Sequence, residues 1–274
     1  MKKVSFLLIL FFLLTISSLT NAVEKIPIFK YKDSIDDSQS LLLEDAGVFN
    51  LDYSEAEYDL RNGFMELNGP GYELRLNENS GHLFLLKQNI ERREVEESDL
   101  SVNSNSLERE TLYLLEKLGI KNTEIGDINT VRIVSQLEDK EGTLIGDEKI
   151  AGFIVSVKRR INGIPVFQGG AKFSYSIDGV LWRADIRWRP IEDTPFGFFT
   201  KVTDDEIQYT IDAILNEKMN GGKPFWQGGF FSYTEGSDHE KRSIMDYKYI
   251  FQYEAVDGSG IEMLEIDALK NKHE

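Results

Sequence analysis

The sequence of 274 residues contains no cysteine. This absence excludes disulfide bonds, thiolate metal sites, a cysteine nucleophile and a lipid anchor attached through cysteine. The folded chain must therefore be stabilised by burial of its core alone. The sequence also lacks any Asn-x-Ser/Thr site for N-linked glycosylation, which is compatible with a bacterial product.

Recognisable arrangements of catalytic residues are absent as well. The three histidines form no His-x-x-x-His or His-Glu-x-x-His pair, which excludes the common zinc-protease site. There is no Gly-x-Ser-x-Gly elbow, no phosphate-binding loop and no dinucleotide fingerprint. We therefore predict no catalytic residue, no metal site and no cofactor, and we expect that the protein is not an enzyme. Because 47 acidic residues could hide a pair of catalytic carboxylates, an uncharacterised hydrolase stays open as a minor alternative.

Long apolar runs are confined to the N-terminus. Residues 1–22 have a basic start, a run of about 13 mostly apolar residues and a small residue at the end, as in a signal peptide. A spanning helix needs about 20 apolar residues. We therefore predict a cleaved signal peptide over 1–22, export to the periplasm or the extracellular medium, and no membrane span after cleavage. An uncleaved N-terminal anchor is the alternative.

Positive charge is scarce: 31 Lys and Arg stand against 47 Asp and Glu, for a formal net charge of −16. Such a surface repels nucleic acids and anionic lipids, so neither is an expected partner. Basic proteins, peptides and divalent ions remain open. The acidic segment Asp33-x-x-Asp36-Asp37 lacks the glycine and the final glutamate of an EF-hand, and we interpret it as a solvated segment.

The pattern of turns and apolar residues divides the rest of the chain. We expect an extended acidic lead-in over 23–57, N-terminal β-strands over 58–90, a central helix-on-sheet unit over 104–190 and a C-terminal helix-on-sheet unit over 191–270. Within 58–90, alternation predicts strands at 58–66, 71–77 and 82–88.

The most strongly patterned stretch is 149–190, which predicts three consecutive strands. The dipeptides Asn162-Gly163 and Asp178-Gly179 tolerate positive φ and predict tight hairpins. In the last strand Trp182, Ala184, Ile186 and Trp188 alternate with Arg183, Asp185, Arg187 and Arg189. One face of this strand is therefore expected to be buried and the other to be wet.

Two amphipathic helices are predicted, at 105–118 and 203–219. Asn105 or Ser106 would cap the first helix, and Thr203 with Glu206 forms a capping box at the second. Their apolar stripes are offset by 100 residues, and each follows a pair of strands and an acidic linker. We interpret this as a tandem of two α+β units, with a chance alignment of two ordinary helices as the alternative.

The order of these elements resembles the PepSY and thermolysin-propeptide (FTP) group of exported bacterial domains, which have a cystatin-like fold. The hairpin Asn162-Gly163-Ile164-Pro165-Val166 followed by Asp178-Gly179 carries the resemblance. The tandem arrangement, including Ile266-Asp267-Ala268 in the closing strands, is more loosely similar to extracellular regulatory proteins of the YycH/YycI type. The resemblance implies tandem sheets, each packed on one helix, and a non-catalytic role.

That role would be binding or regulation of another exported or envelope protein. A protease inhibitor or propeptide-like chaperone acting in trans is the alternative.

One face of the central strands concentrates positive charge in this acidic chain. We expect it to bind an acidic segment of a partner through Lys158, Arg160, Lys172, Arg183, Arg187 and Arg189. The alternative is that these cations pair with the protein's own carboxylates, Asp185 first.

An aromatic cluster flanks the second helix. Its members are Phe196, Phe198, Phe199, Phe225, Trp226, Phe230 and Phe231. We expect most of them to pack in the core of the C-terminal unit, and an exposed peptide-binding patch is the alternative.

Overall fold

A computed structural model describes residues 24–32, 38–91, 93–138, 140–218, 224, 227–235, 242–254 and 260–270. The predicted signal peptide, the acidic segment at 33–37, Phe225 and Trp226 lie outside these residues. Among the helices in the described ranges, none combines the length and the apolar character needed to cross a membrane.

The first strands form two successive hairpins. They are β2 (Glu57–Arg61), β3 (Phe64–Gly69), β4 (Tyr72–Asn77) and β5 (His82–Lys87). The single strand expected at 58–66 is wrong, because Asn62 and Gly63 have φ of +53° and +79° and turn the chain between β2 and β3. An Asn-Gly pair adopts this left-handed geometry readily, so it starts a hairpin inside what looked like one strand.

The central strands are β6 (Ile125–Glu138), β7 (Leu144–Ile161), β8 (Ile164–Tyr175) and β9 (Leu181–Arg187). The structure contains the three strands predicted within 149–190, and the turn between β7 and β8 has positive φ at Asn162 and Gly163. Strand β9 pairs antiparallel with both β8 and β5. The strands expected as a separate N-terminal group therefore continue the sheet of the central unit.

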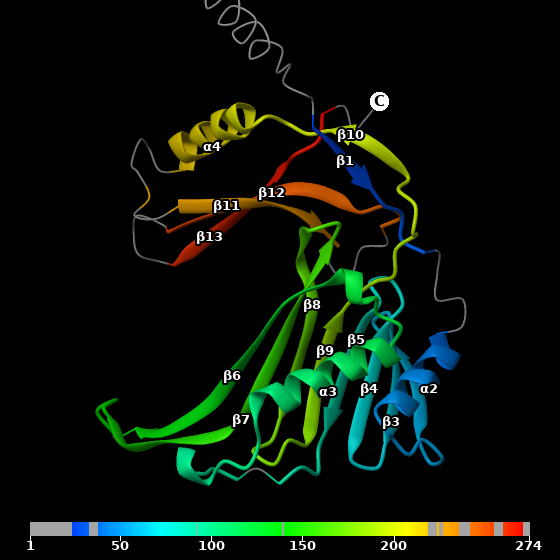
Figure 1. Ribbon diagram of the computed structural model, residues 1–274, viewed down its shortest axis with the longest axis vertical. Coiled ribbons are helices and arrows are strands. Elements are labelled where there is room, and N and C mark those ends of the chain that lie inside the picture. Colours follow the sequence, from blue (N-terminus) through cyan, green and yellow to red (C-terminus); the bar gives the residue numbers. More distant parts are fainter. Residues whose placement is uncertain are drawn as a thin grey trace, which may run out of the picture.

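Two helices, α2 (Ser38–Val48) and α3 (Ser104–Lys117), lie on one face of this sheet (Figure 1). They cover a core that includes Leu42, Leu115, Val155 and Phe173, each with no exposed surface. Asn103, rather than Asn105 or Ser106, caps α3, since its side chain accepts a hydrogen bond from the Asn105 N–H at 2.9 Å.

Helix α2 corrects the expectation of an extended lead-in over 23–57. Leu42, Ala46 and Phe49 recur at helical spacing, and all three are buried in the core beneath α2. Burial of this stripe favours a helix over an extended segment. The chain before it is extended: β1 (Lys25–Ile28) pairs antiparallel with β10 (Gly197–Thr200).

The remaining strands are β11 (Gln227–Thr234), β12 (Asp246–Glu254) and β13 (Ile261–Asp267), which pair antiparallel in this order. Helix α4 (Asp204–Lys218) buries Ile207, Ile211 and Leu215 against β12 and β13. The predicted capping box is present, because the Glu206 N–H donates to Thr203 Oγ1 and the Thr203 N–H donates to the Glu206 carboxylate. The α+β prediction is thus confirmed, with helices packed on a largely antiparallel sheet.

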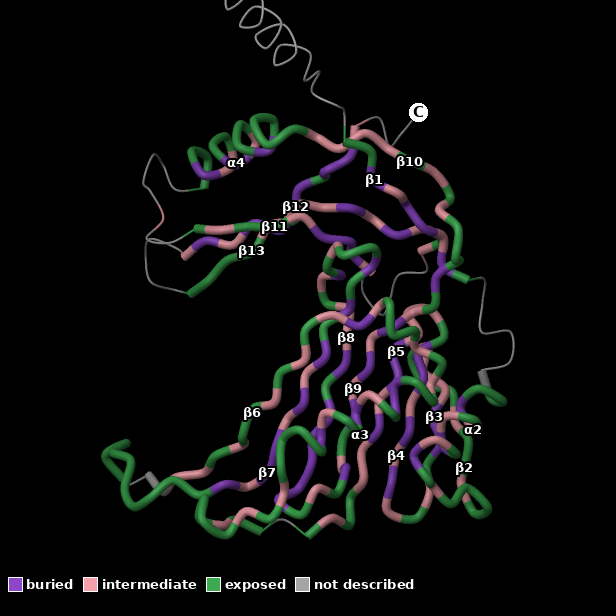
Figure 2. The backbone as a smooth tube through the Cα atoms, in the orientation of Figure 1, coloured by how far each residue is buried: buried purple, intermediate pink, exposed green. Residues whose placement is uncertain are grey.

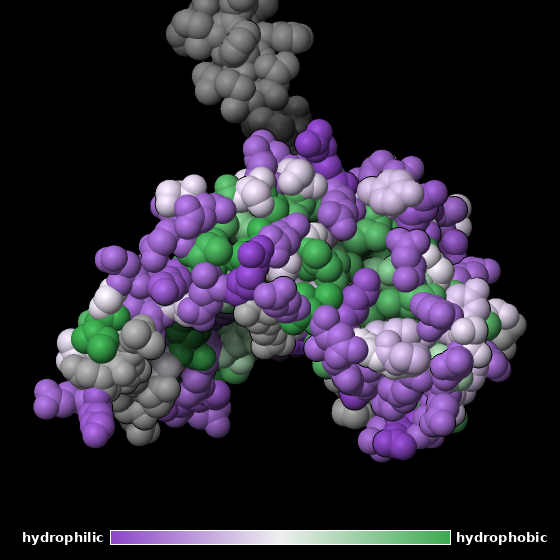
Figure 3. All heavy atoms as spheres, turned by 90° about the horizontal axis from the view of Figure 1, so that it is seen from below, coloured by the Kyte–Doolittle hydropathy of each residue, from purple (hydrophilic) through white to green (hydrophobic). Residues whose placement is uncertain are grey.

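The molecule has two lobes (Figure 1). We call β2–β9 with α2 and α3 the lower lobe, and β1 and β10–β13 with α4 the upper lobe. Buried residues line the inside of each lobe, whereas the projecting β6–β7 hairpin is largely exposed (Figure 2). Seen from below, the outline is hollowed between two prominent ends that are mostly hydrophilic (Figure 3).

Strand β8 joins the lobes. Its last residues pair with β7 and β9, but Val166 and Phe167 pair parallel with Tyr233 and Thr234 of β11, respectively. The chain returns to the lower sheet through Gln168, with φ of +62°, and two glycines. A side chain at Gly170 would place its Cβ 2.4 Å from the Val157 carbonyl oxygen, so the return requires glycine.

Candidate functional site

The strand register brings four of the six predicted cations to the outer face of the lower sheet, which is the face opposite α2 and α3. Lys158 is opposite Gly170, which in turn is opposite Arg187. Lys172 is opposite Asp185, and Ser174 is opposite Arg183. Because side chains alternate along a strand, Lys158, Lys172, Arg183 and Arg187 share this face. We call these four residues the basic face.

A groove of about 630 Å³ opens on the basic face. Three cations line it, Lys158, Lys172 and Arg187, together with one carboxylate, Asp185. The other lining residues are mostly small or uncharged: Ser156, Val157, Gln168, Gly169, Gly170 and Ala171. The detour of β8 toward β11 forms one wall of the groove. The groove therefore carries a local positive charge within a chain whose net charge is −16.

Asp185 takes up part of this positive charge. Its carboxylate lies 3.7 Å from Arg183 and 3.9 Å from Arg187, and it is hydrogen-bonded to His82 Nε2 at 2.9 Å. The His82 hydrogen bond, helped by both arginines, lowers the pKa of Asp185. Within the described part of the chain, Lys158 and Lys172 form no salt bridge. Asp185 thus neutralises part of the positive charge of Arg183 and Arg187, and Lys158 and Lys172 remain available to bind a ligand.

The positive charge does not extend across the whole sheet. Phe84 of β5 lies beneath Arg183, at 5.2 Å from the guanidinium to the ring centroid, and beneath Arg75 at 5.9 Å. Arg75 forms salt bridges with Glu66 of the neighbouring strand β3 and with Glu73 of its own strand, β4. The outer face therefore changes from basic over β7–β9 to balanced over β3 and β4.

The other two predicted cations lie elsewhere. Arg160 is exposed near the β7–β8 turn, beyond the register shift that follows Lys158. Arg189 follows the end of β9, where its guanidinium lies 4.1 Å from the centroid of the Tyr31 ring. Arg189 lies past the end of β9, where alternation no longer applies. Arg160 still follows the alternation of β7, but it lies next to the turn and does not line the groove on the basic face.

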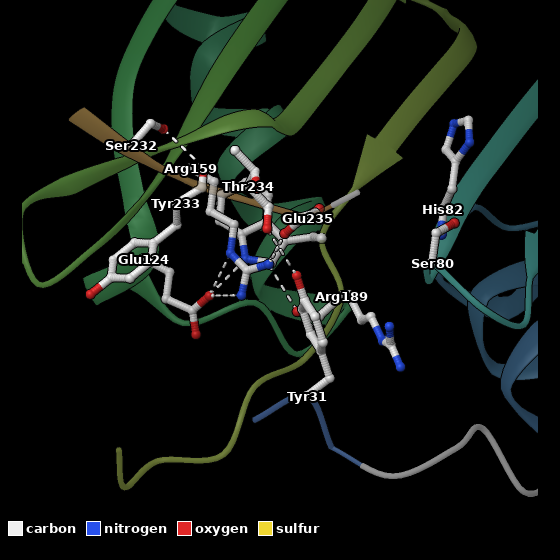
Figure 4. Close-up of polar contacts among 11 residues, drawn as sticks. Tyr31, Ser80, His82, Glu124, Arg159, Arg189, Ser232, Tyr233, Thr234 and Glu235 are labelled. Atoms are coloured by element: carbon white, nitrogen blue, oxygen red, sulfur yellow. Dashed lines mark hydrogen bonds and ion pairs between the residues drawn. The ribbon is translucent and has the colours of Figure 1, made fainter. Parts of the chain in front are cut away.

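A buried ion network joins the two lobes at this point (Figure 4). Arg159 of β7 is 1% exposed. Its Nη2 donates to Glu124 Oε2 at 2.6 Å, and its Nη1 donates both to the Arg189 carbonyl at 2.8 Å and to the Glu235 carboxylate. Glu124 precedes β6 in the lower lobe and Glu235 follows β11 in the upper lobe, so one guanidinium bridges both.

Aromatic residues enclose this network. Trp188 donates its indole N–H to Glu124 at 3.0 Å, and its ring lies 5.5 Å from the Arg159 guanidinium. Burial raises the pKa of Glu235, and the Arg159 charge opposes that rise. Burial also raises the pKa of Tyr31, whose hydroxyl donates to the Thr234 carbonyl at 3.5 Å. A buried charge of this kind is tolerated only when it is fully paired.

The sequence contains a signal for Arg159 that our prediction did not use. Phe153, Val155 and Val157 are buried on the inner face of β7, and alternation places Arg159 on that same face. A charged residue that continues an apolar row predicts a buried ion pair. Its carboxylate partners are 35 and 76 residues away in the sequence, and only the folded chain identifies them.

The aromatic cluster is less buried than expected. Phe198, Phe196 and Phe230 are 64%, 52% and 40% exposed, so the expectation of core packing is wrong for them. Phe199 and Phe231 are partly buried against the core of the upper lobe. The exposed rings have partners nonetheless: Lys30 lies 4.7 Å from the Phe196 ring centroid, and Phe167 lies 6.4 Å from Phe230.

No protein-family model and no curated protein matches this sequence. Among solved structures, an uncharacterised protein from Eubacterium rectale is similar over 88% of this chain and 81% of its own, with 10% identity and a TM-score of 0.47. The C-terminal domain of Bacillus megaterium YpeB is similar over 86% of this chain and 100% of its own, with 8% identity and a TM-score of 0.37. These likenesses assign no family, and the PepSY resemblance stays a prediction from the sequence.

Proposed function

We propose that the protein is an exported, non-catalytic binding protein that docks an acidic segment of another exported or envelope protein on its basic face. The observation that carries this proposal is the groove lined by Lys158, Lys172 and Arg187. Two of these cations have no salt bridge within the described chain, so their charge is available to a ligand.

Charge complementarity selects the class of ligand. A carboxylate-rich segment would be repelled by most of a chain with net charge −16 and attracted only where cations gather. The groove lies along β7, β8 and β9, so an extended segment could follow the strands and meet Lys158 and Lys172 in turn. Lysines present point charges and arginine presents a planar fork, and both suit carboxylates.

The test uses a fluorescent decapeptide of alternating Glu and Gly as a probe. The wild-type protein should bind it, and binding should weaken as salt is added because the contacts are exposed ion pairs. Lys158→Glu/Lys172→Glu should weaken binding by about tenfold or more, which corresponds to about 1.4 kcal/mol. These lysines are preferred over Arg183 and Arg187, since reversing either arginine would also disturb its contact with Asp185.

Lys140→Glu/Lys149→Glu is the matched control, because it changes the net charge by the same four units. Both lysines are exposed, and neither lines the groove. This control should bind the decapeptide as the wild type does. Equal loss in the control and in Lys158→Glu/Lys172→Glu would mean that only net charge matters, and the docking proposal would then fail.

Export rests on the basic start and the apolar run within residues 1–22. N-terminal sequencing of the protein recovered outside the cytoplasm should show a chain that begins near Val23. Recovery of an intact Met1 from the cytoplasm would contradict export.

A further inference from the structure

The other face of the lower sheet contains a second cavity, between helix α2 and the C-terminal end of α3. Both helices lie over the same face of the sheet (Figure 1). A cleft of about 130 Å³ lies where they meet the sheet. Apart from Asp45, the residues that line the cleft are apolar. They are Leu41 of α2, Leu118 and Ile120 after α3, Leu76 of β4, Leu83 of β5, Ile186 of β9, and Gly81, Trp188 and Pro190.

Among the described residues that line this cleft, Asp45 of α2 is the one titratable group. Among the described residues, its carboxylate has no hydrogen bond and no salt bridge. Burial, and to a lesser extent the neighbouring Glu44, raises the pKa of Asp45 to about 7. An unpaired carboxylate at an apolar surface is costly unless a cation or a proton compensates it.

We propose that this cleft binds a primary alkylammonium group, with the aliphatic chain against Leu76, Leu83 and Ile186 and the ammonium on Asp45. The lysine side chain of a partner protein and a free aliphatic amine share this chemistry. The combination of one carboxylate and an apolar lining matches a ligand that has one positive end and an aliphatic stem.

The size of the cleft sets the length of the ligand. A cavity of about 150 Å³ accommodates a six-carbon ring in another protein. By that measure 130 Å³ accommodates about five heavy atoms. Four methylene groups and one nitrogen, the length of a lysine side chain, meet this limit.

The proposed site is independent of the basic face. Leu83, Ile186 and Trp188 belong to the core side of the sheet, whereas Lys158, Lys172 and Arg187 belong to its outer side. The two sites also select ligands of opposite charge. Failure of either proposal therefore leaves the other standing.

The experiment titrates n-butylammonium chloride into the ¹⁵N-labelled protein at pH 8 and follows the indole N–H signal of Trp188. We expect a saturable shift with a millimolar dissociation constant. Asp45→Asn keeps the shape of the side chain and removes its charge, so it should weaken binding by about tenfold or more. Lowering the pH to 6 should weaken wild-type binding about tenfold, because a group with a pKa of about 7 is then mostly protonated.

Glu44→Gln is the matched control, since Glu44 is an exposed neighbour on the same helix and should contribute little to binding. Acetyl-lysine-methylamide, which keeps the side-chain ammonium, distinguishes the two sources. Tighter binding than butylammonium would assign the site to a protein side chain, and weaker binding would assign it to a free amine. Equal affinity of Asp45→Asn and wild type for butylammonium, or an equal response to neutral n-butanol, would overturn the proposal.

Discussion

The raised pKa of Asp45 also predicts how the free energy of unfolding changes with pH in the absence of any ligand. The pKa of this carboxyl is about 7 in the folded protein and 3.8 for the free side chain. Between these values the folded chain holds a proton that the unfolded chain has lost, so this group lowers the free energy of unfolding as the pH rises. Asp45→Asn removes this dependence, because asparagine is neutral throughout.

The size of the effect follows from the pKa difference. About three pKa units at 1.36 kcal/mol each amount to about 4 kcal/mol, which is an upper limit because some solvent reaches the carboxyl. We therefore expect Asp45→Asn to be more stable than wild type by up to about 4 kcal/mol at pH 8. The difference should shrink as the pH falls and approach zero only below pH 3.8, where the wild-type carboxyl is neutral in both the folded and the unfolded state.

Urea denaturation from pH 4 to pH 9, followed by tryptophan fluorescence, measures the effect as a difference between variant and wild type. Taking the difference cancels the titration of all other groups, which the two proteins share. Glu44→Gln should show no comparable rise in stability with pH. A variant-minus-wild-type difference that stays flat from pH 4 to pH 9, or a less stable Asp45→Asn at pH 8, would refute the reasoning.

Three further predictions concern stability. Arg159→Met leaves the largely buried side chains of Glu124 and Glu235 without their cation and should lower the free energy of unfolding by about 3–5 kcal/mol in urea denaturation. A loss below about 1 kcal/mol would mean that solvent compensates both carboxylates. Gly170→Ala places a Cβ against the Val157 carbonyl and should lower the free energy of unfolding by at least about 1–3 kcal/mol. Gly163→Ala should lower it less, because no atom lies within 4 Å of the added Cβ. Equal melting temperatures for the two variants would contradict the close approach at Gly170. Thr203→Ala removes the capping box of α4 and should cost about 1 kcal/mol in the same assay, with unchanged stability counting against the cap.

Local patterns predicted the elements that local physics controls. Asn162-Gly163 favours positive φ at both residues, so a hairpin there depends on no distant contact. The helix at Asp204–Lys218 follows in the same way from its capping box and apolar stripe. Two predictions failed although a local signal was present. Asn62-Gly63 forms a turn inside the single strand predicted at 58–66, and the apolar stripe from Leu42 to Phe49 belongs to a helix rather than to an extended segment.

Local sequence patterns likewise predicted one candidate site and not the other. Lys158, Lys172, Arg183 and Arg187 share a face because alternation holds wherever β7, β8 and β9 are regular. Alternation failed for Arg189, which lies past the end of its strand. Alternation could not predict that Asp45 lines a cleft. That cleft forms only where two helices and three strands from distant parts of the sequence meet.

By itself, the sequence determined most of the strands, two of the helices, the α+β class and the location of four of the six predicted cations. These follow from residue spacing, which repeats every two or 3.6 residues and is independent of the rest of the fold. Only the tertiary structure decided that β5 joins β9, that β8 leaves the lower sheet to pair with β11, and that Arg159 meets Glu124 and Glu235. Such contacts depend on how the whole chain balances burial against the desolvation of charge, and no local window of sequence contains that balance.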